Sequence, residues 1–104
     1  MAQSIKLGND LYIARSGVAG VKGLLGSGDN LNDYWMVHQS GIYYLSSGVT
    51  NSPVNYTFCY VCGSGESASA PCIQVVFAQN AIYTRSRYTQ TWSSWYKYTG
   101  EIVS

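Results

Sequence analysis

The shortness of the apolar runs is the feature that most constrains how this chain can fold. Runs of apolar and aromatic residues recur along the sequence, and they end in Gly, Asn, Ser or Pro. This pattern is typical of strands separated by turns. Residues 31–39 are long enough for one or two helical turns, and no other segment favours an amphipathic helix of normal length. The sequence therefore predicts an all-β protein.

The composition agrees with that fold class. Charged residues make up 11% of the 104 residues and apolar residues 46%, and the chain holds ten Tyr and three Trp. Aromatic side chains suit a pleated, half-buried surface. A chain that stays disordered would need high net charge and few aromatic residues. The length suits a single domain with one core.

Five strands are predicted after residue 28. Each is a short apolar or alternating run bounded by turn residues, and residues 72–78 are apolar enough for a central strand. Along 81–88 the side chains alternate, which places Tyr83 and Arg85 on one face. The predicted strands are 41–45, 56–61, 72–78, 81–88 and 92–98. Such strands predict a small antiparallel β-sandwich or one folded antiparallel sheet.

Residues 1–28 have a different pattern, and the sequence places a boundary near residue 29. Alternation on either side of a Gly-containing turn predicts a β-hairpin over residues 4–15. A lone hairpin is marginal in water and needs a surface to pack on. Glycine then recurs at every third position from Gly17 to Gly26, as in a collagen-type helix. Because the repeat is short and lacks proline, an extended Gly-rich connector is favoured over a triple helix.

The charge pattern excludes two classes of partner. The formal net charge is +1 and no basic stripe is present, so nucleic-acid binding has little electrostatic support. No apolar run approaches the roughly 20 residues that span a bilayer, so membrane insertion is not expected. The first residues lack an apolar signal core, which favours synthesis in the cytoplasm.

The three cysteines do not form a clear framework. An odd number fits a set of disulfides poorly. Cys59 and Cys62 have the spacing of half a zinc or redox site, but residues three apart on a strand point to opposite faces. His38 is the sole histidine that could add a ligand. We therefore expect small buried thiols in a reducing compartment, with no metal and no cofactor.

Catalytic constellations are equally weak. Nothing in the spacing brings His38 to Cys59 as a base for a nucleophile. Asp29 and Asp33 lie close together, but at the start of the strand-rich region, where Asp commonly caps a turn. A glycosidase needs two carboxylates that converge on a substrate. The sequence therefore predicts a protein that is not an enzyme.

Binding is the class of function that the composition favours. Tyr and Trp offer rigid amphipathic contact area, and flat aromatic rings stack on sugars. The candidate ligand-binding residues are Tyr43, Tyr83, Arg85, Arg87, Trp92 and Trp95. A structural alternative stands beside each: Trp92 and Trp95 suit core packing, and Arg85 suits an internal hydrogen bond or cation–π contact. The loops 46–55 and 63–71 are further candidates for recognition.

Five short pieces follow one another between residues 30 and 98. They are a Leu-Asn start, a strand that begins with Gly and carries Tyr, an Asn-x-Pro turn, a Tyr-x-Arg strand and a Trp-x-x-Trp end. In this sequence they are Asn30-Leu31-Asn32-Asp33, Gly41-Ile42-Tyr43-Tyr44-Leu45, Thr50-Asn51-Ser52-Pro53, Ile82-Tyr83-Thr84-Arg85 and Trp92-Ser93-Ser94-Trp95. In this order they resemble the knob domain of R-type pyocin tail fibres, a module also found in many phage fibres.

The resemblance implies a receptor-binding tip protein of a phage or prophage tail fibre, which recognises a bacterial surface glycan or another receptor. It implies a homotrimer that contacts other tail-fibre or baseplate proteins and is assembled, in the bacterial host cytoplasm, into the tail of a virion or phage-like particle. Residues 1–28 are then a trimerising or shaft-joining segment, and residues 29–104 a knob-like β domain. Two alternatives stay open: a structural spacer or assembly knob without a ligand, and a stand-alone lectin-like module.

Overall fold

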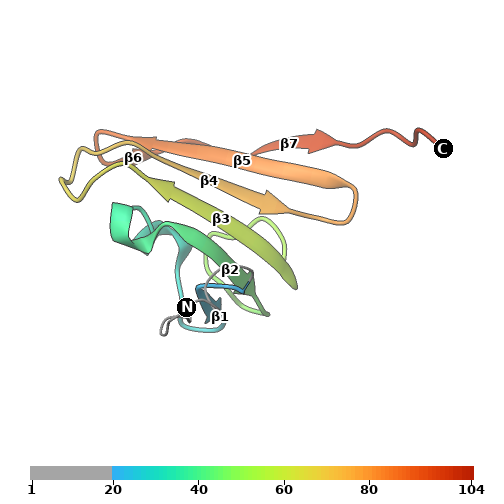
Figure 1. Cartoon of the computed structure of the whole chain (residues 1–104), viewed down its shortest axis with the longest axis horizontal. Helices are drawn as coiled ribbons and strands as arrows, with labels where there is room; N and C mark the ends of the chain where they lie inside the picture. Colours follow the sequence, from blue (N-terminus) through green and yellow to red (C-terminus); the bar gives the residue numbers. More distant parts are fainter. Residues whose placement is uncertain (1–19) are drawn as a thin grey trace, which may run out of the picture.

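The computed structural model describes residues 20–104, so the hairpin expected at 4–15 lies outside the described part. The described residues form strands and two single turns of 3-10 helix, η1 (Leu31–Asp33) and η2 (Val37–Gln39), with no α-helix among them. The all-β prediction is confirmed. None of the helices in this part of the chain could cross a membrane, since all are too short. Figure 1 shows the long strands running side by side across the molecule, with the C-terminal segment extending away from them.

Within residues 20–104 seven strands form one sheet. They are β1 (Gly23–Leu25), β2 (Gly41–Leu45), β3 (Thr57–Gly63), β4 (Cys72–Phe77), β5 (Ala81–Tyr88), β6 (Thr91–Trp92) and β7 (Tyr96–Thr99). The strands neighbour one another in order from β1 to β5, and both β6 and β7 pair with β5. β1 runs parallel to β2, and every other pair is antiparallel. The structure is thus one mixed sheet and not a two-sheet sandwich.

β1 is a strand that the sequence assigned to the connector. Its residues pair with β2, with Gly23 opposite Tyr43 and Leu25 opposite Leu45. Gly23 lies directly against the Tyr43 ring, since a Cβ atom at this glycine would come within 3.2 Å of the ring. Close packing therefore accounts for one glycine of the three-residue repeat. The sheet begins before the expected boundary at residue 29.

The predicted strand 92–98 is in fact two strands, interrupted at residues 93–95. The Ser93 hydroxyl accepts a hydrogen bond from the Ser86 amide at 3.0 Å, and the Ser93 amide donates to the Ser86 carbonyl at 2.8 Å. Beyond this link, Trp95 packs against the core, and its Nε1 donates to the Asn51 carbonyl at 3.0 Å. The interruption therefore gives Trp95 a place in the core instead of a place in a regular strand.

The inner face of the sheet is the face that η1, η2 and the loop 46–56 cover. Because side chains alternate along a strand, every second residue of β2, β3 and β4 points to it. The residues of β1 to β4 that are buried on this face are Leu25, Tyr43, Leu45, Cys59, Val61, Cys72, Gln74 and Val76. Leu31 and Val49 pack on them from the covering segments. Burial of each large apolar side chain contributes about 1.5–3 kcal/mol.

Buried amide groups fasten the covering segments to the sheet. Gln74, on the central strand β4, is fully buried, and its Nε2 donates to the carbonyls of Leu31 and Tyr34, both at 2.8 Å. The Asn30 Oδ1 accepts from the Asn51 side chain at 2.9 Å, which joins the segment before η1 to the loop after β2. The bonds of Gln74 satisfy a buried amide that would otherwise cost free energy, whereas the bond between Asn30 and Asn51 lies at the surface.

Candidate functional site

The six residues that the sequence nominated for ligand binding come together, but on the inner face. Tyr43, Arg85 and Arg87 keep 5%, 6% and 8% of their surface exposed. The other three nominated residues are half-buried and pack against the core: Tyr83, Trp92 and Trp95. The cluster is a packed interior and offers little surface to a receptor. Ligand binding by these six residues stays a prediction.

Arg85 is held between two indole rings. Its guanidinium carbon lies 3.9 Å from the centre of the Trp92 ring and 4.6 Å from that of Trp95. Its Nε donates to Gln74 Oε1 at 2.9 Å. Burial lowers the pKa of Arg85 to about 10. The aromatic faces supply the attraction that a carboxylate would otherwise supply, so the structural alternative for Arg85 and for both Trp residues is confirmed.

Arg87 uses the same chemistry to fix a loop. Its guanidinium carbon lies 4.1 Å from the centre of the Trp35 ring, and its Nη1 donates to the Ala68 carbonyl at 2.9 Å. Ala68 belongs to the loop between β3 and β4. The loop 63–71, a candidate for recognition in the sequence, is therefore tied to the sheet by a buried arginine.

Cys59 and Cys62 lie on opposite faces of β3, as the alternation of side chains along a strand predicts. Cys59 is fully buried on the inner face, whereas Cys62 is exposed. Desolvation raises the pKa of Cys59 to about 12 and that of Cys72 to about 11, so both thiols are neutral at physiological pH. Because their thiols point to opposite faces of β3, Cys59 and Cys62 cannot bind the same metal ion. Within residues 20–104 no cluster of three or more His, Cys, Asp or Glu residues could hold a metal.

His38 lies at the surface and not beside a cysteine. Its Nδ1 is 2.8 Å from the Glu66 Oε2, and both side chains are 60% exposed. An exposed pair of this kind contributes little to stability and is screened by salt. The pair links η2 to the loop between β3 and β4, and it has no buried surroundings that would tune it for proton transfer.

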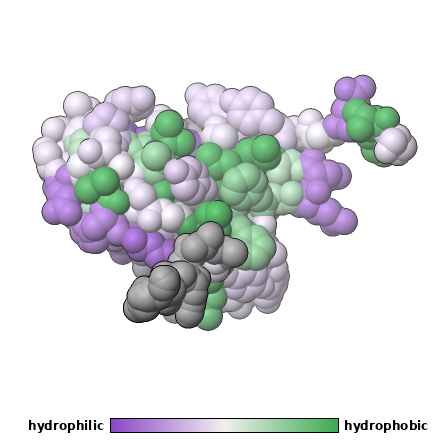
Figure 2. Space-filling model, viewed as in Figure 1, coloured by the Kyte–Doolittle hydropathy of each residue, from purple (hydrophilic) through white to green (hydrophobic). Residues whose placement is uncertain are grey.

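The opposite face of the sheet, which we call the outer face, is apolar and open. Its residues are Leu24, Ile42, Tyr44, Phe58, Tyr60, Cys62, Ile73, Val75, Phe77, Ile82, Thr84, Ser86, Tyr88, Tyr96 and Tyr98. None of them is charged. Among the exposed large apolar side chains of this face, the exposed fraction ranges from 38% for Tyr60 to 74% for Leu24. Figure 2 shows hydrophobic residues gathered over the middle of the molecule, with hydrophilic residues toward the margins.

Register aligns these side chains in rows across the strands. One row runs from Tyr44 through Phe58, Phe77 and Ile82 to Tyr98, each residue opposite the next. The rings of Tyr44 and Phe58 meet edge to face, with centroids 5.4 Å apart. Cross-strand aromatic pairs of this kind stabilise a sheet and hold the rings in place.

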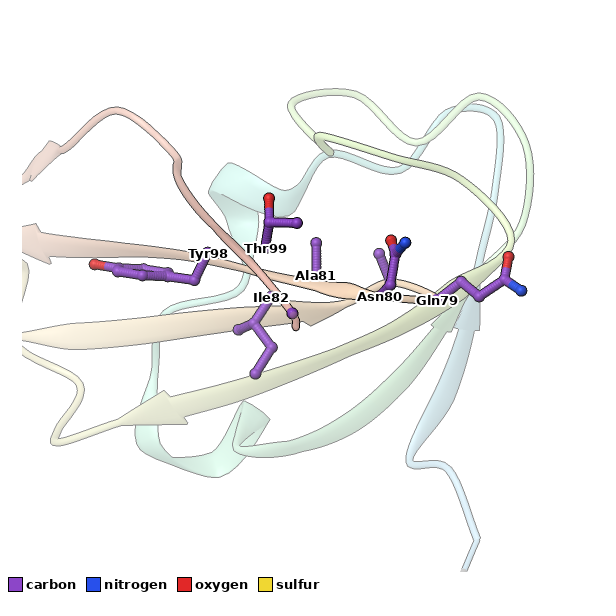
Figure 3. A pocket seen from close by; sticks show the side chains of 8 residues that line it. Gln79, Asn80, Ala81, Ile82, Tyr98 and Thr99 are labelled. Atoms are coloured by element: carbon purple, nitrogen blue, oxygen red, sulfur yellow. The ribbon is translucent and has the colours of Figure 1, made fainter. Parts of the chain in front are cut away.

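A hollow of about 430 Å³ lies where this row reaches the edge of the sheet. We call it the edge hollow; it is lined by Ala78, Gln79, Asn80, Ala81, Ile82, Tyr98, Thr99 and Gly100. Figure 3 shows these residues coming from the turn after β4, from the start of β5 and from the end of β7. The Gly100 amide donates to the Asn80 carbonyl at 2.7 Å, which closes one end. The lining offers an exposed aromatic ring, two amide side chains and a hydroxyl, without any charged group.

The sequence did not single out Tyr98, Tyr96 or the turn residues of the edge hollow. Alternation predicted which side chains share a face of β5, but it did not say which face is covered. The charges on Arg85 and Arg87 favoured that face as the exposed one, since arginine is rarely fully buried. A usable signal was present in the other face of β5, which carries no charge at all.

Comparison of the chain with family models, with curated proteins and with solved structures finds no match. The proposals that follow therefore rest on the residues themselves, on their resemblance to fibre knobs, and on the geometry of the two faces.

Proposed function

We propose that this protein is a non-enzymatic binding module of a phage or phage-like tail fibre, and that it recognises a neutral glycan on the bacterial surface as a homotrimer. The order of motifs between residues 30 and 98 supports the fibre assignment. The all-β fold, with loops and strand ends around one rigid sheet, supports a role in recognition.

The observation that carries the glycan assignment is the chemistry of the edge hollow. Tyr98 is 58% exposed and presents an aromatic ring, on which the apolar face of a sugar can stack. Gln79 and Asn80 carry amide groups that donate to and accept from sugar hydroxyls. Because no charged residue lines the hollow, a neutral sugar fits it better than an acidic one.

The test is binding of the full chain to a panel of neutral bacterial oligosaccharides, followed by titration calorimetry with those that bind. We expect Tyr98→Ala to weaken binding by about tenfold, a loss of about 1.4 kcal/mol. Tyr88→Ala is the matched control, because Tyr88 is 57% exposed on the same face but lies outside the hollow. Equal binding by both variants, or no binding by the wild type, would contradict the glycan assignment.

A purely structural role is the second candidate, and the breadth of the outer face favours it. The apolar area extends over β2, β3 and β4, well beyond the edge hollow. A surface so wide and uncharged suits contact with protein better than contact with sugar. A spacer would bind no oligosaccharide in the experiment above, while circular dichroism would show that it is folded and light scattering that it associates.

A further inference from the structure

We propose that the part of the outer face formed by β2, β3 and β4 is the surface on which copies of this chain pack against one another. We call this part the packing face; it consists of Ile42, Tyr44, Phe58, Tyr60, Cys62, Ile73, Val75 and Phe77. The inference rests on the proposed function for its setting, a particle in which several copies stand together. Its evidence is the face itself.

The first argument is area. Five large side chains of the packing face, on three neighbouring strands, are 38–47% exposed, and Leu24 beside them is 74% exposed. With about 200 Å² for each large side chain, the packing face exposes about 420 Å², and the ten exposed large apolar side chains of the whole outer face together expose about 1,000 Å². The largest apolar patch on an ordinary monomer is about 300–600 Å², and each partner in a stable complex contributes about 800 Å². The packing face is therefore the part on β2 to β4 of an apolar surface that is as large as a stable interface.

The second argument is charge. Copies arranged around a symmetry axis bring the same residues of different copies close together. A charged residue on such a surface would face its own like charge, which is repulsive. The packing face has no charged residue, although the inner face of the sheet has Arg85 and Arg87 on the neighbouring strand β5. A foreign partner is more often selected by complementary charge, so the observations favour a second copy.

The third argument is rigidity. β3 and β4 are paired on both sides, so the backbone under the packing face is fixed. The edge-to-face contact of Tyr44 with Phe58 fixes the rings as well. A surface that is already ordered loses little conformational entropy on association. The edge hollow is lined by the turn after β4 and by residues of β5 and β7, so it borders the packing face at Phe77.

Cys62 provides a direct probe of this surface. It is the exposed cysteine, and it lies opposite Ile73 in the end row of the packing face, while Cys59 and Cys72 are buried. An aromatic disulfide reagent should therefore react quickly with one thiol per chain when the packing face is open. It should react slowly with all three thiols when another copy covers the face.

The experiment measures mass by light scattering together with the rate of this thiol reaction, on the full chain under reducing pretreatment. We expect the wild type to have a multiple of 11.4 kDa, with Cys62 protected. Ile73→Lys should give a folded monomer. Because its ammonium lies opposite Cys62 and would itself activate the thiol, the rate is measured in Phe58→Ser, whose Cys62 should react faster than that of the wild type by about tenfold or more. Val37→Lys is the matched control, because Val37 is 45% exposed, against 47% for Ile73, but lies on η2. It should behave like the wild type.

Two results would overturn the inference. One is a wild-type mass of 11.4 kDa at all concentrations. The other is an oligomer whose Cys62 reacts at the monomer rate, because the copies would then meet on another part of the chain. Circular dichroism establishes that Ile73→Lys is folded; were it unfolded, Phe58→Ser would replace it on the same face. Glycan binding is measured separately, and a monomer that binds glycan would sink this inference and the homotrimer while leaving the glycan assignment of the proposed function in place.

Discussion

Cys59 and Cys62 lie three residues apart on β3, and they belong to two different surfaces. Cys59 is fully buried in an interior where aromatic rings, amides and two arginines satisfy one another. Cys62 lies on the outer face, among exposed apolar residues that carry no charge and form few hydrogen bonds. The inner face is covered within one chain, although the Nη2 of Arg85 is buried there without a hydrogen-bond partner. The outer face has the composition of an interior but lacks a cover, so it is the incomplete half of the sheet.

The two faces also differ in what they contain of the five sequence pieces on which the expected resemblance to fibre knobs rests. Leu31, Asn51, Arg85 and Trp95, which belong to four of these pieces, lie on the inner face or in the segments that cover it. The outer face and the edge hollow are built mainly from residues outside these pieces.

The largest expected effect is a core truncation compared with the same truncation outside. Leu45→Ala removes a side chain with no exposed surface, and it should lower the free energy of unfolding by about 2–5 kcal/mol. Leu24→Ala, at a site 74% exposed, should cost less than about 1 kcal/mol. Urea unfolding in the monomeric Ile73→Lys background measures both. Equal losses would mean that the outer face is a second core within the monomer.

The next effect tests whether the inner polar network acts as a unit. Gln74→Leu leaves the Nε of Arg85 without its acceptor and removes one donor from the carbonyls of Leu31 and Tyr34; the Leu31 carbonyl still accepts from the Tyr34 amide. An unsatisfied buried group costs about 1–3 kcal/mol. The further change Arg85→Met removes the orphaned donor, so the double variant should lose less stability than the sum of the two single variants. Strict additivity in urea unfolding would show that Arg85 does not depend on Gln74.

The sequence was sufficient to predict the strands because alternation is a local property. The predicted ranges 41–45 and 81–88 coincide with β2 and β5. β1 was missed, since a three-residue strand of Gly-Leu-Leu has no pattern of its own and exists through its pairing with β2. The break at 93–95 was missed for a similar reason, because it depends on a bond between Ser93 and Ser86.

The site was harder to predict because exposure is a property of the whole fold. Alternation correctly grouped Tyr83 with Arg85 and Arg87, but the choice of exposed face depended on what covers the sheet. Trp92 and Trp95 make the inner face hospitable to a guanidinium, and nothing in local sequence signals that arrangement. The outer face could be recognised only from the folded structure, which shows that no segment covers it.

A smaller effect comes from two neighbouring valines on β4. Val76 has no exposed surface on the inner face, whereas Val75 is half-buried on the outer face. Val76→Thr buries a hydroxyl without a partner and should cost about 1–3 kcal/mol. Val75→Thr should change stability by less than about 0.5 kcal/mol in the monomeric background, because water can reach the hydroxyl. Thermal unfolding of the two variants compares the two faces at neighbouring positions of β4. A larger loss of stability in Val75→Thr than in Val76→Thr would mean that the outer face, and not the inner face, is the buried one.

Cys59 and Cys62 should also differ in how they make stability depend on pH, and at neutral pH this is the smallest of the expected effects. Burial raises the pKa of Cys59 from 9.0 to about 12, so above pH 9 the thiol ionises in the unfolded chain but not in the folded one. The unfolded state then binds fewer protons, and stability falls as the pH rises from 9 toward 12. Cys59→Ala should remove part of this fall, whereas Cys62→Ala should retain it. Urea unfolding is measured between pH 8 and about pH 9.5, below the pKa of about 10 of Arg85, because deprotonation of Arg85 in the folded state acts on stability in the opposite direction. Parallel profiles for the wild type and Cys59→Ala would show that water reaches this thiol, and with it that the inner face is less completely closed than its packing indicates.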